Sequence, residues 1–247
     1  MTHDDDASRQ PWKGAHQTRV FIIGATGGIG SRVAAQLLKQ GDQPIGLHRH
    51  PDQARMLQAQ GVEPVHGDLS LMPMADMAAR MKGADAVVFA AGASEDGTRV
   101  ADAVDGQGMV LATAAAQAAG VRRFLHVSAF PDAWRDQRMP AEFEHYMKVK
   151  RQADVHLAST SLDWVILRPG TLTTRPGTGS VRLGMAIPYD EVSRDDVAAV
   201  LVELVHAPEV TRLILEVTAG DIPVREALVT AVTGAMGFAP TAAVPPR

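Results

Sequence analysis

The sequence predicts one α/β domain built on a doubly wound parallel sheet. Short β-branched runs alternate with alanine-rich helical stretches from Arg19 onward, and 46% of the 247 residues are hydrophobic. Strands that alternate with helices form βαβ units, whose right-handed crossovers cover both faces of a parallel sheet. The length suits one large domain better than two.

The elements are expected in a regular order over the first two thirds of the chain. Strands are predicted at 19–25, 43–49, 62–68, 84–92, 121–130 and 162–170, and helices at 28–41, 51–61, 74–83, 106–120 and 141–160. Proline opens and glycine closes the helix at 51–61, which is typical of helix ends.

The regular alternation of strands and helices ends at about residue 170. A segment rich in glycine, threonine and arginine is followed by a helix capped by Ser193, a strand at 213–220 and a last helix within 221–236. Residues 1–18 are polar and aperiodic, and we expect them to form a disordered leader. The domain is therefore predicted to span 19–247, with a small C-terminal elaboration on the substrate side from about residue 170.

Composition excludes several classes of function. A formal net charge of −4 argues against a nucleic-acid partner, and the absence of cysteine excludes disulfides and thiolate metal sites. No apolar run approaches membrane-spanning length, and the acidic N-terminus lacks the apolar core of a signal peptide. The histidines show no convincing ligand spacing, so no metal site is predicted. We expect a cytoplasmic protein that acts on a small molecule.

A glycine-rich loop, GATGGIG at 24–30, separates the first strand from the first helix. Gly24 would permit the tight turn, Gly27 would let backbone approach a pyrophosphate, and Gly30 would let helix and strand pack closely. The free N–H groups and the dipole of the helix start attract an anion. We interpret the loop as a dinucleotide site rather than a plain turn, formed by Gly24, Thr26, Gly27, Gly28, Ile29 and Gly30.

The end of the second strand bears on the choice of cofactor. An NAD site places an acid there for the ribose 2′-hydroxyl, whereas this chain has Arg49 and no acid before Asp52. An arginine can bind a 2′-phosphate in bidentate fashion, which favours NADP(H). A solvated loop arginine is the alternative. Arg32, in the first turn of the helix, is a second candidate for the adenosine end.

Two further strand ends supply candidate cofactor residues. Asp68, followed by Leu69, ends the third strand and is placed to hydrogen-bond the adenine edge, although a turn aspartate is an equal alternative. Small residues at the end of the fourth strand, Ala90, Ala91 and Gly92, leave room for a cofactor to lie across the strand ends.

A serine, a tyrosine and a lysine form the candidate catalytic set. Tyr146 and Lys150 share one face of a predicted helix, one turn apart, in a chain with only two tyrosines and five lysines. A nearby ammonium stabilises a phenolate, so the pair suits proton relay; a plain helix surface pair is the alternative. Ser128 falls at the carboxyl end of the fifth strand, where ligands bind in such sheets.

The chain resembles the short-chain dehydrogenase/reductase superfamily, in its atypical NAD(P)-binding branch. The resemblance rests on FIIGATGGIGSRV, DAVVFAAG, VDGQG, GVRRFLHVSAF, HYMKVKRQAD, LDWVILRPGTLT and VSRDDVA, in the family's order. It implies a Rossmann-like fold and a catalytic set of Ser128, Tyr146 and Lys150, with the tyrosine as acid/base. It also implies that Lys150 holds the nicotinamide ribose and that Pro169 lies in the turn beside the carboxamide.

Two functions follow as expectations. The first is an NADPH-dependent oxidoreductase that reduces a small carbonyl or quinone-like substrate by hydride transfer. The alternative is an NADP(H)-binding, redox-sensing regulator without catalysis. Sugar epimerases are disfavoured because the C-terminal region is short, and a monomer or homodimer is expected.

Overall fold

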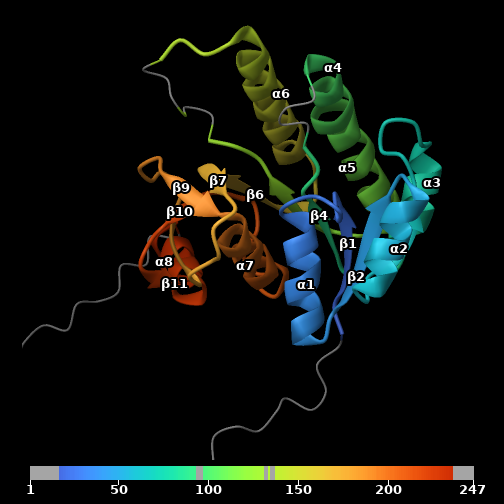
Figure 1. The fold of residues 1–247 in the computed structure, drawn as a ribbon, viewed down its shortest axis with the longest axis horizontal. Helices are drawn as coiled ribbons and strands as arrows, with labels where there is room; N and C mark the ends of the chain where they lie inside the picture. Colours follow the sequence, from blue (N-terminus) through green and yellow to red (C-terminus); the bar gives the residue numbers. More distant parts are fainter. Residues whose placement is uncertain (1–16, 93–96, 131–132, 134–136, 236–247) are drawn as a thin grey trace, which may run out of the picture.

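In the computed structural model, which describes residues 17–92, 97–130, 133 and 137–235, a nine-stranded sheet forms the centre of the molecule, with helices on both faces (Figure 1). Most of the predicted leader, residues 1–16, and the end of the chain, residues 236–247, lie outside the described residues. The α/β fold predicted from the sequence is confirmed.

Seven strands of the sheet are parallel and lie in the order β3-β2-β1-β4-β5-β6-β10. Their bounds are β1 (Arg19–Ile23), β2 (Gln43–His48), β3 (Glu63–His66), β4 (Ala86–Phe89), β5 (Arg123–Val127), β6 (Asp163–Pro169) and β10 (Leu213–Ala219). The direction of winding reverses between β1 and β4. Such a reversal opens a crevice at the carboxyl ends of the strands.

Two helical layers cover the sheet. The helices are α1 (Gly30–Gln40), α2 (Pro51–Ala59), α3 (Met74–Met81), α4 (Thr98–Ala101), α5 (Gly108–Ala119), α6 (Ala141–Ala158), α7 (Arg194–Val205) and α8 (Val224–Ala235). Alternate residues of β1 enter different cores: Val20 and Ile22 pack with α1, α7 and α8, whereas Phe21 and Ile23 pack with α3, α5 and α6. Burial on both faces explains the continuous apolar runs of the central strands.

The C-terminal elaboration departs from the parallel pattern. β8 (Ser180–Gly184) joins β10 antiparallel, and β11 (Ile222–Pro223) joins β8, so the sheet ends in an antiparallel edge. A separate two-stranded ribbon pairs β7 (Thr171–Thr173) with β9 (Glu191–Ser193), directly before α7. Ser193 caps α7 as predicted, because its side chain accepts a hydrogen bond from the backbone of Asp196.

The helix expected at 106–120 begins earlier than the sequence indicated. α4 runs into a π-helix, η1 (Asp102–Gln107), which continues into α5. The backbone of Gly108 packs against Leu69, where a Cβ atom would lie 2.7 Å from the leucine side chain. The wide turn of η1 points Asp105 into the protein, where it is fully buried. π-helical turns frequently occur at functional sites.

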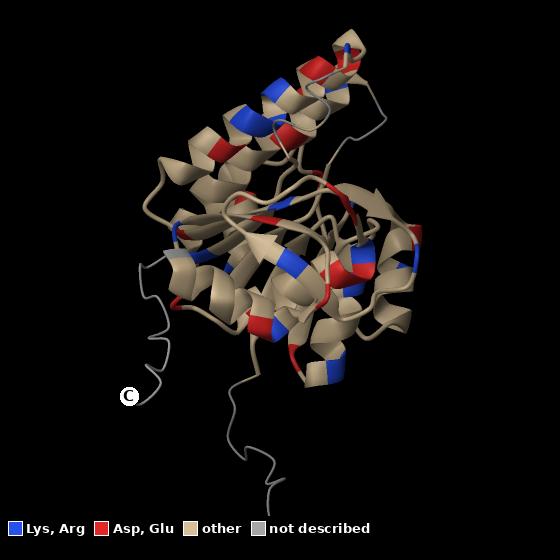
Figure 2. Cartoon of the chain, turned by 90° about the vertical axis from the view of Figure 1, so that its left-hand side faces the viewer, with Lys and Arg blue, Asp and Glu red and all other residues tan. Residues whose placement is uncertain are grey.

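Charge is mixed over the molecule. Lys and Arg residues are interspersed with Asp and Glu along the helices rather than gathered in a basic stripe (Figure 2). Among the described helices, none is long and apolar enough to span a membrane.

Candidate functional site

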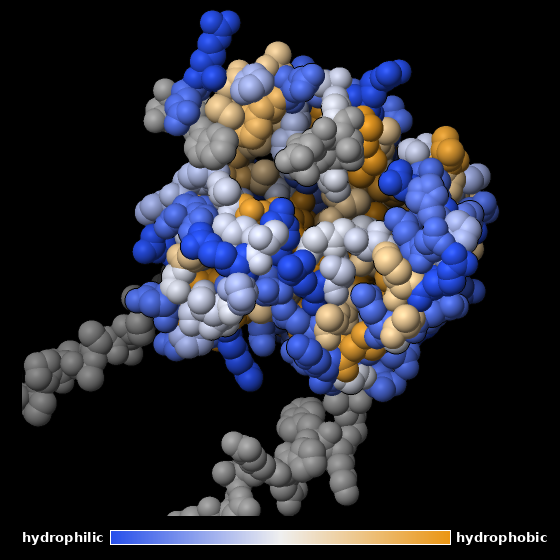
Figure 3. All heavy atoms as spheres, in the orientation of Figure 1, coloured by the Kyte–Doolittle hydropathy of each residue, from blue (hydrophilic) through white to orange (hydrophobic). Residues whose placement is uncertain are grey.

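A cavity of about 350 Å³ opens at the carboxyl ends of the central strands. The surface is hollowed in the middle of the molecule, with apolar side chains in its depth (Figure 3). The volume falls in the range of small-molecule sites. The cavity gathers most of the residues that the sequence singled out: Gly24, Thr26, Gly27, Gly28, Ile29, Arg49, Asp68, Leu69, Ala90, Ala91, Gly92, Ser128, Tyr146 and Lys150.

Three of the predicted residues, Gly30, Arg32 and Pro169, are absent from the cavity wall. Gly30 lies behind the loop, where a Cβ atom would collide with the carbonyl oxygen of Gly24, so it serves the close packing of helix and strand. Pro169 is buried at the end of β6, and it does not line the cavity. Its expected place beside a carboxamide stays a prediction.

The glycine loop has the geometry of an anion site. Gly24 has a φ of +91°, and a Cβ atom there would lie 2.6 Å from the backbone nitrogen of Ala91. Gly27 and Gly28 present bare backbone to the cavity. No side chain caps the start of α1, and its first turn holds no acid. A helix start with free N–H groups and no competing carboxylate fits a phosphate.

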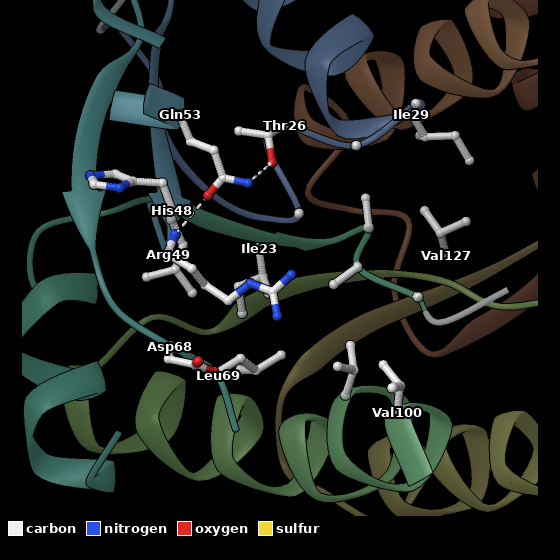
Figure 4. A pocket seen from close by; sticks show the side chains of 18 of the residues that line it. Ile23, Thr26, Ile29, His48, Arg49, Gln53, Asp68, Leu69, Val100 and Val127 are labelled. Carbon is white, nitrogen blue, oxygen red and sulfur yellow. Dashed lines mark hydrogen bonds between the residues drawn. The ribbon is translucent and has the colours of Figure 1, made fainter. Parts of the chain in front are cut away.

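Arg49 follows β2 and lies on the wall of the cavity (Figure 4). Its backbone N–H donates to Oε1 of Gln53 at 2.9 Å, and Nε2 of Gln53 donates to Oγ1 of Thr26 at 3.3 Å. Gln53, which the sequence analysis did not single out, therefore joins the end of β2 to the glycine loop. The side chain of Arg49 extends from the end of β2 into the cavity (Figure 4).

Asp68 and Arg32, the candidates for the adenosine end, both hydrogen-bond to other residues of the protein. Oδ1 of Asp68 accepts hydrogen bonds from the backbone and the hydroxyl of Ser70, at 2.9 and 2.6 Å, and the hydroxyl contact holds the pKa of Asp68 below its usual value. The turn aspartate is thus present, and the adenine contact stays a prediction. Arg32 is committed elsewhere, because it binds the carbonyl of Gly28 at 2.7 Å and the carboxylate of Asp195 at 2.8 Å.

Lys150 is held inside the protein beneath the cavity. Its Nζ donates to Oδ1 of Asp105 at 3.0 Å and to the carbonyl of Val127 at 2.8 Å, and it lies 5.9 Å from the ring centre of Tyr146. Burial alone would lower the pKa of Lys150, but Tyr146 and Asp105 together raise it. The side chain is therefore a fixed cation. Two of its three N–H donors are used within the protein, which leaves one for the ribose contact that the resemblance implies.

Tyr146 is a phenol at neutral pH. Burial raises its pKa above the ordinary value of 10, and the opposing effect of Lys150 is smaller. The spacing of Tyr146 and Lys150 predicts that the ammonium favours the phenolate; that effect is present, but burial outweighs it. A protonated phenol can donate a proton and cannot accept one, which suits the direction of reduction.

A buried polar group lies below Ser128. Arg168 donates to Oδ2 of Asp154 from Nη2 and Nε, at 2.8 and 3.0 Å, and Nε2 of His126 lies 3.6 Å from Oδ1. Burial raises the pKa of Asp154, and the hydroxyl of Ser128 and the guanidinium of Arg168 oppose the shift. The hydroxyl of Ser128 is thus buried beside the carboxylate of Asp154, although it makes no hydrogen bond of good geometry to a described residue.

Two acids of this site, Asp105 and Asp154, were not among the residues predicted from the sequence. Asp154 follows Lys150 by one helical turn, as Lys150 follows Tyr146, so the three residues form a stripe on α6 that the i, i+4 spacing could have revealed. Asp105 stands in the VDGQG motif, but only the π-helix turns it toward Lys150.

Comparison with known proteins agrees with this geometry. A family model described as NAD(P)H-binding matches residues 24–208, from the glycine loop to the end of α7. The chain belongs to the NAD(P)H-binding family. Within it, the "Uncharacterized sugar epimerase YhfK" of Bacillus subtilis is 34% identical over 216 residues, which covers 85% of this chain and 98% of the relative.

Solved structures of similar proteins show the same fold. A protein of Bacillus halodurans, provisionally named as an NAD-dependent epimerase/dehydratase, superposes with a TM-score of 0.79 and 30% identity, over 86% of this chain and 99% of its own. ChuY of Escherichia coli O157:H7, an anaerobilin reductase by name, has a TM-score of 0.71 and 27% identity, over 83% and 98% of the two chains.

Proposed function

We propose that the protein is an NADPH-dependent oxidoreductase that reduces a small carbonyl or quinone-like substrate by hydride transfer. The observation that carries the proposal is the meeting of Ser128, a protonated Tyr146 and the fixed cation Lys150 in the same cavity as the glycine loop. The name of ChuY as a reductase supports the class of reaction.

Each group of the site has a part in this reaction. The uncapped start of α1 and the bare backbone of Gly27 and Gly28 would hold the diphosphate of the cofactor. Arg49 would bind the 2′-phosphate, which would account for a choice of NADPH. Bound NADPH would supply the hydride.

The proton comes from the protein. The hydroxyl of Ser128 donates a hydrogen bond to the substrate carbonyl oxygen and so orients it. As the carbonyl carbon accepts the hydride, Tyr146 gives its proton to the oxygen, and an aldehyde or ketone leaves as an alcohol. A quinone leaves as the hydroxydienone, which tautomerises to the hydroquinone. Lys150 stabilises the phenolate that remains until solvent returns a proton. Asp105 and the carbonyl of Val127 keep the ammonium in place throughout.

Tyr146→Phe tests the proposal. The ring stays and the proton donor is lost, so turnover should fall by about 10²–10⁴-fold while NADPH affinity hardly changes. The assay is NADPH oxidation with a panel of quinones, flavins, aldehydes and ketones. Tyr189→Phe is the matched control, since Tyr189 does not line the cavity, and it should keep full turnover.

Two outcomes would contradict the proposal in different ways. Turnover that survives Tyr146→Phe would exclude the tyrosine as proton donor and indicate direct hydride transfer onto a flavin-like acceptor. Tight NADPH binding without turnover of any acceptor by the wild-type protein would favour the redox-sensing regulator.

A further inference from the structure

Arg194 begins α7 and lies on the cavity wall next to the glycine loop. Its Cδ and Nε atoms lie 3.0 Å from the point that a Cβ atom on Gly28 would occupy, so the side chain packs over the bare backbone of that glycine. Its Nη1 donates to the carbonyl oxygen of Leu172 at 3.3 Å. The guanidinium is thus half-buried between the glycine loop and β7.

The charge of Arg194 has no acidic partner within the described part of the chain. The two acids that follow it are engaged elsewhere. Asp195 forms an ion pair with Arg32 at 2.8 Å, and Asp196 accepts a hydrogen bond from the hydroxyl of Ser193 at 2.7 Å. A half-buried guanidinium without a counter-charge favours an anion in the adjoining cavity.

The start of α7 is fixed against the glycine loop. Arg32 binds both Asp195 and the carbonyl oxygen of Gly28, and Nε2 of Gln36 donates to the backbone carbonyl of Asp195 at 3.0 Å. These contacts join α1, the loop and α7. They set the position of Arg194 relative to Gly28 before any ligand binds.

We infer that Arg194 binds the diphosphate of the dinucleotide, as a cation that acts beside the backbone N–H groups of the glycine loop. The inference rests on the dinucleotide site of the proposed function and adds a residue from the C-terminal elaboration to it. Arg49 lies beyond a different strand, β2, and is assigned to the 2′-phosphate. The two arginines therefore serve different parts of one ligand, and their removal should give different binding patterns.

Three nucleotides separate the two arginines by calorimetric titration. NADPH carries both anionic groups, NADH carries the diphosphate alone, and 2′-AMP carries the 2′-phosphate alone. Arg194→Gln should weaken NADPH and NADH equally, by about ten-fold or more, and should leave 2′-AMP unchanged. Arg49→Gln should weaken NADPH and 2′-AMP and spare NADH. Arg182→Gln, an exposed arginine of β8 outside the cavity, should change none of them.

Several results would overturn the inference. One is an Arg194→Gln variant that binds NADPH as tightly as the wild type; if its KM for the acceptor is raised at the same time, the arginine contacts the substrate instead. Another is an Arg194→Gln variant whose affinity for 2′-AMP falls as much as its affinity for NADPH. If the wild-type protein binds neither NADPH nor NADH, the proposed function is wrong as well. If the wild type binds both and Arg194→Gln binds them equally well, only this inference is wrong. If Arg194→Gln does not fold, Arg194→Lys replaces it and should weaken NADPH and NADH by equal, smaller factors.

Discussion

At the residue scale, the protonation states of the site follow from burial and from one acid. Tyr146 stays protonated because its ring is withdrawn from water, and Lys150 stays charged because the carboxylate of Asp105, 3.0 Å away, opposes the effect of burial. His126 beneath them is neutral, since burial and the charge of Lys150 both lower its pKa. At neutral pH the proton that the reaction needs is therefore on the hydroxyl of Tyr146.

Arg49 decides between the two dinucleotides at this scale. Arg49→Glu should reverse the preference, because a carboxylate repels the 2′-phosphate and accepts from the 2′-hydroxyl. The lost charge-assisted contact should cost NADPH binding about 1.5–3 kcal/mol, or roughly ten-fold or more in Kd. Calorimetric titration of NADPH and NADH measures this. Arg55→Glu on α2, also exposed but outside the cavity, is the control; wild-type protein that binds NADH as well as NADPH would refute the assignment.

His126 should make the stability of the fold depend on pH. The unfolded chain takes up a proton on this histidine near pH 6.5, and the folded chain does not, because burial holds the pKa well below that value. The unfolded state thus binds more protons below pH 6.5, so the free energy of unfolding falls there, by at most about 2 kcal/mol between pH 6.5 and 5.0. Urea unfolding at pH 7.5 and 5.0 measures the loss. His126→Gln should show a smaller loss, and an equal loss would contradict the explanation.

At the element scale, the glycine loop contains two kinds of glycine. Gly27 faces the cavity, whereas Gly30 faces the backbone of Gly24. These two roles could be predicted from the sequence because the positions of the three glycines are fixed relative to the strand before them and the helix after them. It did not reveal the π-helix η1, since that turn depends on the packing of Gly108 against Leu69 and on the buried ion pair of Asp105.

Gly27→Val and Gly30→Val should separate binding from folding. A Cβ atom on Gly27 would lie 3.2 Å from the carbonyl oxygen of Gly24, a tight contact that a shift of a few tenths of an ångström relieves, so this variant should fold with a smaller loss of Tm than Gly30→Val and lose measurable NADPH binding. On Gly30, a side chain would collide with the Gly24 carbonyl and lower Tm markedly. Circular dichroism melts and nucleotide titration check both. If Gly27→Val binds NADPH as well as the wild type, the loop is an ordinary turn and not a cofactor site.

At the scale of the whole molecule, the site forms because the chain reverses its winding between β1 and β4. The alternation of elements predicted the sheet, and the carboxyl ends of parallel strands share one edge, so Gly24, Arg49 and Ser128 could be placed together from the sequence alone. The antiparallel edge of β8 and β11 could not, because strands of five and two residues are too short to carry a periodic signal. Arg194 was overlooked for a related reason: its contact with Gly28 exists only once the C-terminal elaboration folds back over the loop.

A crystal structure with NADPH tests the central claim most directly, namely that one cavity holds the whole dinucleotide with its reactive end at the catalytic set. We predict the 2′-phosphate at Arg49, the diphosphate at Gly27 and Gly28, and C4 of the nicotinamide beside the hydroxyl of Tyr146, with open space for an acceptor at about 3–3.5 Å from C4. A nicotinamide turned away from Ser128 and Tyr146, or one packed against protein with no space for an acceptor, would contradict the proposal that the protein is an oxidoreductase.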